Sequence, residues 1–148
     1  MGLLTSLQGD RIYLDTNIWI YALEGFPTFF QELTALFQSI DQGNLQAITS
    51  ELTLAEVLVK PIQNGNSIQQ DTYKQAITSN SHLLVIPIQR ELLINAAQLR
   101  VTTNLKLPDA IHAATALATQ CSTFLTNDLK FQNVSGLQIV VLSQVIFP

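Results

Sequence analysis

The sequence contains few charged residues and one cysteine. Charged residues make up 12% of the 148 positions, about half the share of an average soluble domain. The single Cys121 excludes an intramolecular disulfide and a cysteine-zinc cluster, and it is typical of a protein from a reducing compartment. Although 47% of the residues are hydrophobic, no apolar run has the length of a membrane span, and residues 1–10 lack the basic start of a secretory signal. We therefore expect a single cytoplasmic domain over residues 1–148, without a membrane segment.

Basic residues are also scarce. Seven Lys and Arg stand against eleven Asp and Glu, which gives a net charge of −4. Proteins that coat nucleic acid without selectivity depend on clustered positive charge, and here the seven bases form no cluster along the chain. The composition therefore favours selective recognition over broad electrostatic binding of nucleic acid. Low charge together with high hydrophobicity also predicts apolar surface that a partner covers.

Apolar segments and turn residues alternate along the chain in the order expected for an α/β protein. Short apolar runs predict strands, whereas helical spacing, a cap at Ser50 and a first-turn proline at Pro108 predict helices. The alternation implies a mostly parallel sheet with helices on both faces, which binds ligands at the carboxyl ends of its strands. The expected strands cover residues 11–15, 45–49, 83–86, 123–126 and 139–142, and the expected helices cover residues 28–40, 51–61, 67–79, 92–99 and 108–120.

Four acidic residues occupy unusual positions in this pattern. Asp15 and Asp128 each follow a strand, Glu56 lies inside an apolar helix, and Asp109 lies in the first turn of an alanine-rich helix. Taken singly, each could be a helix cap, a turn residue or an exposed helix residue. Without these four, however, seven acidic residues would balance the seven basic ones, so the net charge formally resides in this set. If the four converge, their repulsion raises their pKa values unless a divalent cation neutralises them.

The donor set indicates which cation would fit. Carboxylate oxygens favour Mg²⁺ or Mn²⁺. Zinc is disfavoured because only His82 and His112 could supply nitrogen and no cysteine pair exists. His112 follows Asp109 by three residues on the same helical face, which suggests a ligand, but its apolar and alanine neighbours favour a packed histidine.

Four ordered motifs carry a family resemblance that extends over roughly residues 11–142. They are YLDTNI at 13–18, SELTLAEV at 50–57, LPDAIHAATA at 107–116 and FLTND at 124–128. Together they resemble the PIN-domain nucleases, and most of all the VapC toxins of bacterial type II toxin-antitoxin systems. The resemblance implies a three-layer α/β/α sandwich on a mostly parallel sheet, formed by one nuclease domain over residues 1–148.

The resemblance also implies a site and an activity. Asp15, Glu56, Asp109 and Asp128 match the acidic quartet that holds Mg²⁺ or Mn²⁺ in a metal-dependent endoribonuclease. We expect Asp15 and Asp109 to be direct ligands, while Glu56 and Asp128 either complete the shell through water or orient the attacking water. The family's supporting positions, which order the motif loops or contact the ligand shell, correspond to Asn17 and Thr126. One or two metal ions are compatible with this set.

Relatives in this family form homodimers and are silenced by a small antitoxin. The resemblance therefore implies a cognate antitoxin and a homodimer, and the acidic composition predicts that the RNA substrate is a structured one. Three alternatives are open: a PIN RNA-processing nuclease without an antitoxin, a PIN fold that only binds, and a non-catalytic signalling module in which Asp15 accepts a phosphoryl group. The last is disfavoured because the acidic pair beside the first strand and the late lysine of receiver domains are missing. A haloacid-dehalogenase-like phosphatase is disfavoured because Asp15-Thr16-Asn17 lacks its second aspartate.

Overall fold

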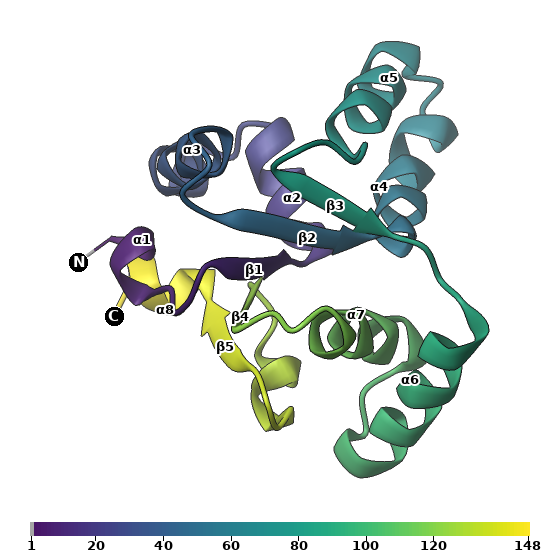
Figure 1. The fold of residues 1–148 in the computed structure, drawn as a ribbon. Helices are drawn as coiled ribbons and strands as arrows, with labels where there is room; N and C mark the ends of the chain where they lie inside the picture. The colour runs from purple at the N-terminus through teal and green to yellow at the C-terminus, as the bar shows by residue number, and fades with distance from the viewer. Residues whose placement is uncertain (1) are drawn as a thin grey trace.

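The computed structural model describes residues 2–148, which form a five-stranded sheet with helices packed on both faces (Figure 1). The strands are β1 (Arg11–Leu14), β2 (Gln46–Ser50), β3 (Leu83–Ile86), β4 (Thr123–Thr126) and β5 (Gln138–Val141). The helices are α1 (Leu3–Ser6), α2 (Thr16–Leu23), α3 (Pro27–Asp41), α4 (Glu51–Gln63), α5 (Ser67–Ala76), α6 (Arg90–Thr103), α7 (Leu107–Ala118) and α8 (Leu142–Ile146), with a 3-10 helix η1 (Leu129–Asn133).

The sheet is entirely parallel, with the strand order β3-β2-β1-β4-β5. In register, Tyr13 of the central strand pairs with Ile48 on one side and Phe124 on the other. The chain winds outward from β1 in both directions, so the strand order reverses between β1 and β4. In open parallel sheets, the carboxyl ends of the strands at such a reversal border the crevice where ligands bind.

Alternate residues of β1 face opposite layers, as the pleat of a strand requires. Ile12 and Leu14 belong to a core with α2, α3, α4 and α5, whereas Tyr13 belongs to a second core with α6, α7 and η1. Figure 1 shows these two groups of helices above and below the sheet. The three-layer α/β/α sandwich expected from the sequence is therefore confirmed.

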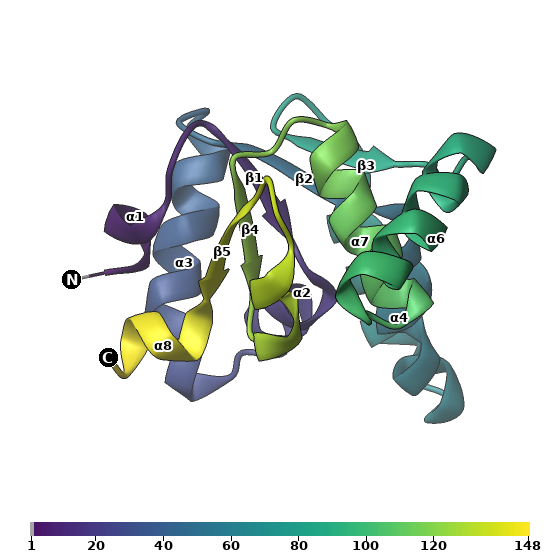
Figure 2. The same ribbon diagram turned by 90° about the horizontal axis from the view of Figure 1, so that it is seen from below.

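Helix α7 lies close against the sheet because its inward face is built from small residues. Ala110, Ala113 and Ala114 are buried, and α7 packs along α6. Close packing of this kind brings the polar residues of α7, Asp109 and His112, to the edge where β1 ends. At the other side of the molecule, α8 continues from β5 next to α1 and the chain termini (Figure 2).

Several helix boundaries differ from those expected. The stretch after Asp15 forms α2, which the short apolar run at 18–21 does not reveal by periodicity. Pro61 was expected to end α4, but the helix continues to Gln63 with the proline buried. Proline has no backbone N–H, so α4 lacks the intrahelical hydrogen bond that another residue at this position would donate. None of the helices within residues 2–148 combines the length and hydropathy needed to cross a bilayer.

Candidate metal-dependent active site

The candidate site lies at the carboxyl ends of β1 and β4, where the strand order reverses. Asp15 follows β1 directly and donates its backbone N–H to Leu125 of β4 at 3.0 Å. Asp128 follows β4 after one intervening residue. Both also cap helices: the Asp15 side chain accepts from Thr16 N at the start of α2, and the Asp128 side chain accepts from Lys130 N at the start of η1. The capping role and a position at the ligand-binding edge therefore coexist in both residues.

Asp15 is a buried carboxylate, only 5% exposed. Its Oδ1 accepts from Thr16 N at 2.8 Å and its Oδ2 accepts from the Thr126 hydroxyl at 2.7 Å. Burial raises the pKa of Asp15, and the charge of Asp109 adds to this effect, while His112 and the two hydrogen bonds oppose it. The site thus holds a carboxylate whose ionised form is not fully compensated by the protein.

Glu56 reaches the same place from α4 and is held by two donors. His112 Nε2 lies 2.6 Å from Glu56 Oε1, and the Thr16 hydroxyl donates to the same oxygen at 2.7 Å. His112 Nε2 also lies 3.9 Å from Oδ1 of Asp15. Desolvation raises the pKa of Glu56, but the hydrogen bonds from His112 and Thr16 outweigh it and lower the pKa below its usual value.

His112 is packed, as its apolar neighbours predict, but its ring nitrogens have polar partners. The side chain is 1% exposed, and its Nδ1 lies 2.6 Å from the Tyr13 hydroxyl. Sequence reasoning undervalued this residue and missed Thr16 and Tyr13 as its partners. The signal for His112 was its spacing from Asp109, because residues three apart share a helix face. Nothing in the sequence alone pairs Tyr13 with it, because the contact joins β1 to α7.

Asp109 and Asp128 form a second pair, bridged by Lys130. The Lys130 Nζ lies 3.6 Å from Oδ2 of Asp109 and 3.4 Å from Oδ2 of Asp128. These two carboxylates raise the pKa of Lys130, which lies in solvent. The two pairs are connected through Thr126, which donates to Asp15 and accepts from the backbone N–H of Asp128 at 3.0 Å.

Asn17 and Thr126, the two expected supporting residues, contact each other, and their further partners are Asn127 and Asp15. Asn17 Nδ2 lies 3.5 Å from Thr126 Oγ1, and Asn17 Oδ1 accepts from the backbone N–H of Asn127 at 3.2 Å. Asn127 in turn accepts from Ser143 N at 2.9 Å. These bonds tie the loop that carries Asp128 to the start of α2.

The four carboxylates therefore occur as two pairs, each bridged by a basic side chain. His112 lies between Asp15 and Glu56, and Lys130 lies between Asp109 and Asp128. Within residues 2–148, no three His, Cys, Asp or Glu side chains are already placed to hold a metal ion together. The donor set nevertheless suits a hard cation, because the four acids supply oxygen ligands and Asp15 is buried and incompletely neutralised.

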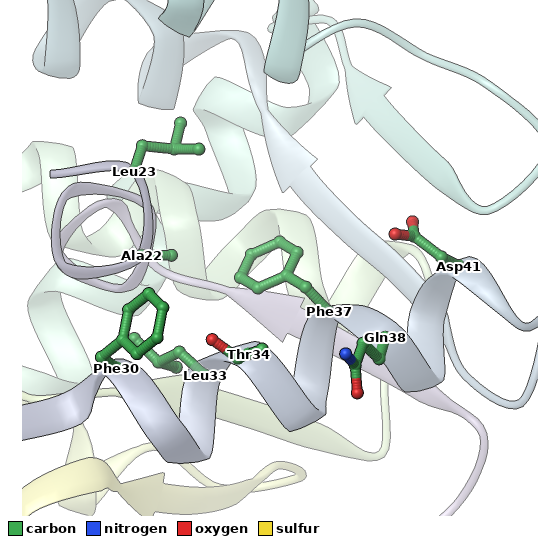
Figure 3. Close-up of a pocket in the computed structure, with 8 residues that line it drawn as sticks. All are labelled: Ala22, Leu23, Phe30, Leu33, Thr34, Phe37, Gln38 and Asp41. Atoms are coloured by element: carbon green, nitrogen blue, oxygen red, sulfur yellow. The ribbon is translucent and has the colours of Figure 1, made fainter. Parts of the chain in front are cut away.

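A separate apolar groove lies between α2 and α3 and encloses about 310 Å³. Figure 3 shows the rings of Phe30 and Phe37 on α3, with Ala22 and Leu23 of α2 lining the other side. Phe30 is 55% exposed and lies next to Leu33 and Phe37 in the groove lining, so its ring forms part of a continuous apolar surface. The groove shares no residue with the acidic site. Its lining consists of Ala22, Leu23, Phe30, Leu33, Thr34, Phe37, Gln38 and Asp41.

Comparison with solved structures supports the fold. A chain of VapBC2 from Rickettsia felis, bound to a DNA fragment from its promoter, is similar with a TM-score of 0.68 and 20% identity, over 88% of this chain and 98% of that one. A toxin-antitoxin complex from Klebsiella pneumoniae has a TM-score of 0.66 and 27% identity, over 88% and 97% of the two chains. VapC20 from Mycobacterium tuberculosis, a toxin that cleaves the sarcin-ricin loop, has a TM-score of 0.62 and 16% identity, over 76% and 86%.

Sequence comparison gives the family. None of the curated proteins is significantly similar in sequence. The sequence model of the PIN domain, however, matches residues 12–137, a segment that contains Asp15, Glu56, Asp109 and Asp128. Because this match covers most of the 148 residues, the chain belongs to the PIN domain family.

Proposed function

We propose that the chain is a divalent-metal-dependent endoribonuclease and the toxin of a type II toxin-antitoxin pair. The observation that carries the proposal is the buried Asp15 carboxylate at the strand-order reversal, joined through His112 to Glu56 and through Thr126 to the loop of Asp128. Membership in the PIN domain family argues against the two alternatives from other families, a receiver-like signalling module and a haloacid-dehalogenase-like phosphatase.

The metal would be Mg²⁺ or Mn²⁺, held directly by Asp15 and Asp109, with Glu56 and Asp128 acting through water or orienting the attacking water. When bound, such a cation makes water nucleophilic and stabilises charge on the phosphate oxygens. The chain's own groups prepare the site. Thr16 and Thr126 orient the two oxygens of Asp15, and burial excludes bulk water from it. In this proposal, Lys130 leaves the Asp109–Asp128 pair and contacts the substrate phosphate at the rim.

The substrate proposed is a structured RNA. The chain has only seven Lys and Arg and a net charge of −4, so affinity for arbitrary nucleic acid should be low and recognition should depend on shape. The similar VapC20 is a toxin that cleaves the sarcin-ricin loop, which is consistent with a folded RNA target.

The partner proposed is a cognate antitoxin, and the α2–α3 groove is its docking surface. The groove is apolar and has a half-exposed phenyl ring at Phe30. The similar structure from Klebsiella pneumoniae is a toxin-antitoxin complex.

A homodimer in the cytoplasm remains a prediction from the sequence, and light scattering of the purified chain tests its oligomeric state.

The decisive experiment incubates the purified chain with total RNA, with Mg²⁺ or Mn²⁺ and with excess chelator, and maps the new RNA ends. We expect discrete cuts that disappear with chelator and with Asp15→Asn. Uncut RNA in both metals, or cuts that persist in Asp15→Asn, would refute the nuclease. Co-purification with the product of a small adjacent gene distinguishes a toxin from a PIN nuclease that works without an antitoxin.

A further inference from the structure

A buried chain of hydrogen bonds runs from the middle of the sheet to the acidic site. The Tyr13 hydroxyl lies 2.6 Å from Nδ1 of His112, and Nε2 of His112 lies 2.6 Å from Oε1 of Glu56. Tyr13 and His112 are almost completely buried. The three side chains come from β1, α7 and α4, so the chain crosses from one helix layer to the other through the edge of the sheet.

The direction of each hydrogen bond follows from the chemistry of the two ends. An ionised carboxylate only accepts, so Nε2 of His112 must donate to Glu56. In the proposed arrangement the imidazole carries one proton, on Nε2, so Nδ1 accepts from the Tyr13 O–H; a doubly protonated ring would instead donate from Nδ1 to the Tyr13 oxygen. An ordinary phenol is protonated at neutral pH and can donate, and the Tyr13 hydroxyl lies within hydrogen-bond distance of Nδ1. The tyrosine thereby selects the histidine tautomer that can hold Glu56.

The position of Tyr13, the first residue in this series of hydrogen bonds, is fixed by the sheet. It occupies the central strand and is hydrogen-bonded into the ladder with β2 and β4. Its ring stacks on Phe124 at a centroid distance of 5.0 Å and an interplanar angle of 6°, and meets the His112 ring edge to face at 5.8 Å. The orientation of the imidazole is therefore set by the sheet rather than by solvent.

Both donors to Glu56 act on the same oxygen. His112 and Thr16 each contact Oε1, and within residues 2–148 neither of these bonds involves Oε2. With Oε1 occupied by two donors, Oε2 is the oxygen that remains for a water or a cation.

We propose that Tyr13 and His112 are positioning residues that fix Glu56 through Oε1 and present Oε2 to the reaction. This role rests on the proposed nuclease function. Outer-shell groups of this kind, which orient a ligand or a base, typically change activity about 10–100-fold when removed. Neither residue touches the substrate in this proposal, so substrate binding should be unaffected.

The first test reads the tautomer directly. The chain has two histidines, so a His82→Gln background leaves His112 as the only imidazole for ¹⁵N NMR. We expect the proton on Nε2 in this background, and a mixture of tautomers after Tyr13→Phe. A proton on Nδ1 in the His82→Gln protein, or a spectrum that Tyr13→Phe leaves unchanged, would contradict the proposed hydrogen bonds from Tyr13 through His112 to Glu56.

The second test separates positioning from stability. Tyr13→Phe should lower kcat about tenfold or more and leave KM within about twofold. Tyr73→Phe is the matched control, because the buried Tyr73 of α5 also donates to a carboxylate, at 2.5 Å, but to that of Glu24, the residue that follows α2. We expect Tyr73→Phe to keep kcat. Equal kcat losses in the two variants would show a general effect of losing a buried hydroxyl and overturn the proposal.

Conservative rescue gives an independent readout. The amide nitrogen of His112→Gln can replace Nε2 as a donor to Glu56, whereas His112→Leu fills similar volume without a donor. We expect His112→Gln to retain clearly more activity than His112→Leu, and equal activity would contradict the positioning role. If the unmodified chain cuts no RNA, the nuclease proposal itself fails. If it cuts RNA and Tyr13→Phe has full kcat, only the positioning role of Tyr13 and His112 fails.

Discussion

Thr126 donates its hydroxyl hydrogen to Oδ2 of Asp15 across 2.7 Å, and both side chains are buried. A neutral hydroxyl orients a carboxylate but does not cancel its charge. The bridging His112 is 3.9 Å from Asp15, and burial still raises the pKa of this carboxyl. The folded chain therefore carries an electrostatic cost at Asp15 that a bound cation would relieve.

The first prediction is that Asp15→Asn stabilises the metal-free protein while abolishing cleavage. Asparagine removes the buried charge and keeps an oxygen acceptor for Thr16 N, while its amide nitrogen, which only donates, can bond Thr126 once the Thr126 hydroxyl turns from donor to acceptor. We expect a gain of about 1 kcal/mol in the free energy of unfolding, the scale of a typical single stabilising substitution. Chemical denaturation in chelator measures it. Asp71→Asn, on the exposed surface of α5, is the control and should change little. A less stable Asp15→Asn would contradict the interpretation.

The second prediction concerns pH, and Asp15 and Glu56 should behave in opposite ways. Because the folded pKa of Asp15 is raised, its cost is absent below the ordinary value of 3.8 and appears as pH rises through the raised pKa. The stability advantage of Asp15→Asn should grow over that range. The folded pKa of Glu56 is lowered, so its stabilising effect is present above 4.5 and is lost as pH falls through the lowered pKa.

Thermal melts in chelator across this pH range check both signs. Glu56→Gln should be less stable than the unmodified chain above pH 4.5, and the difference should shrink as the pH falls. If the stability of both variants changed with pH in parallel with that of the unmodified chain, neither carboxyl would differ in pKa between the folded and unfolded states.

The fold could be predicted well from the sequence because its strands and their turns are local signals. Residues 83–86 and 123–126 coincide with β3 and β4, and the alternation of elements correctly gave a parallel sheet. Helix ends were less accurate, since α6 begins at Arg90 and extends to Thr103, beyond the apolar positions that revealed it. The apolar run after Asp15 was too short to show that it forms α2.

The sequence predicts which helices and strands carry the four acidic residues, but not which basic side chain bridges which pair of them. The positions of Asp15 and Asp128 after strands follow from sequence pattern, since parallel strands end at one edge. The bridge from Glu56 to His112 joins α4 to α7, and that from Asp109 to Asp128 depends on a lysine in η1. Such contacts depend on helix packing angles and rotamers, which residue spacing along one element does not determine.

The third prediction is that Lys130→Ala strengthens binding of Mn²⁺. The ammonium group lies within 3.6 Å of a carboxylate oxygen on both Asp109 and Asp128 and competes with a cation for them. Because Lys130 lies in solvent, its interaction is screened and the gain should be only a few-fold in Kd. Calorimetric titration with Mn²⁺ measures the change. Lys74→Ala, which removes an exposed lysine from α5, should leave Kd unaltered. Weaker Mn²⁺ binding by Lys130→Ala would mean that the lysine supports the metal site.

The fourth prediction tests the α2–α3 groove with Phe30→Glu. Phe30 is 55% exposed, so a charged side chain there should cost little folding stability, but it would face the apolar rings and Leu23 of the groove. Aromatic side chains at the centre of an interface commonly contribute most of its affinity, so the antitoxin should bind about tenfold or more weakly. RNA cleavage by the free chain should be unchanged, because the groove shares no residue with the acidic site. Val101→Glu, at an exposed apolar position on α6, is the matched control and should bind the antitoxin normally. Equal affinity of the two variants for the antitoxin would place its docking surface elsewhere on the chain.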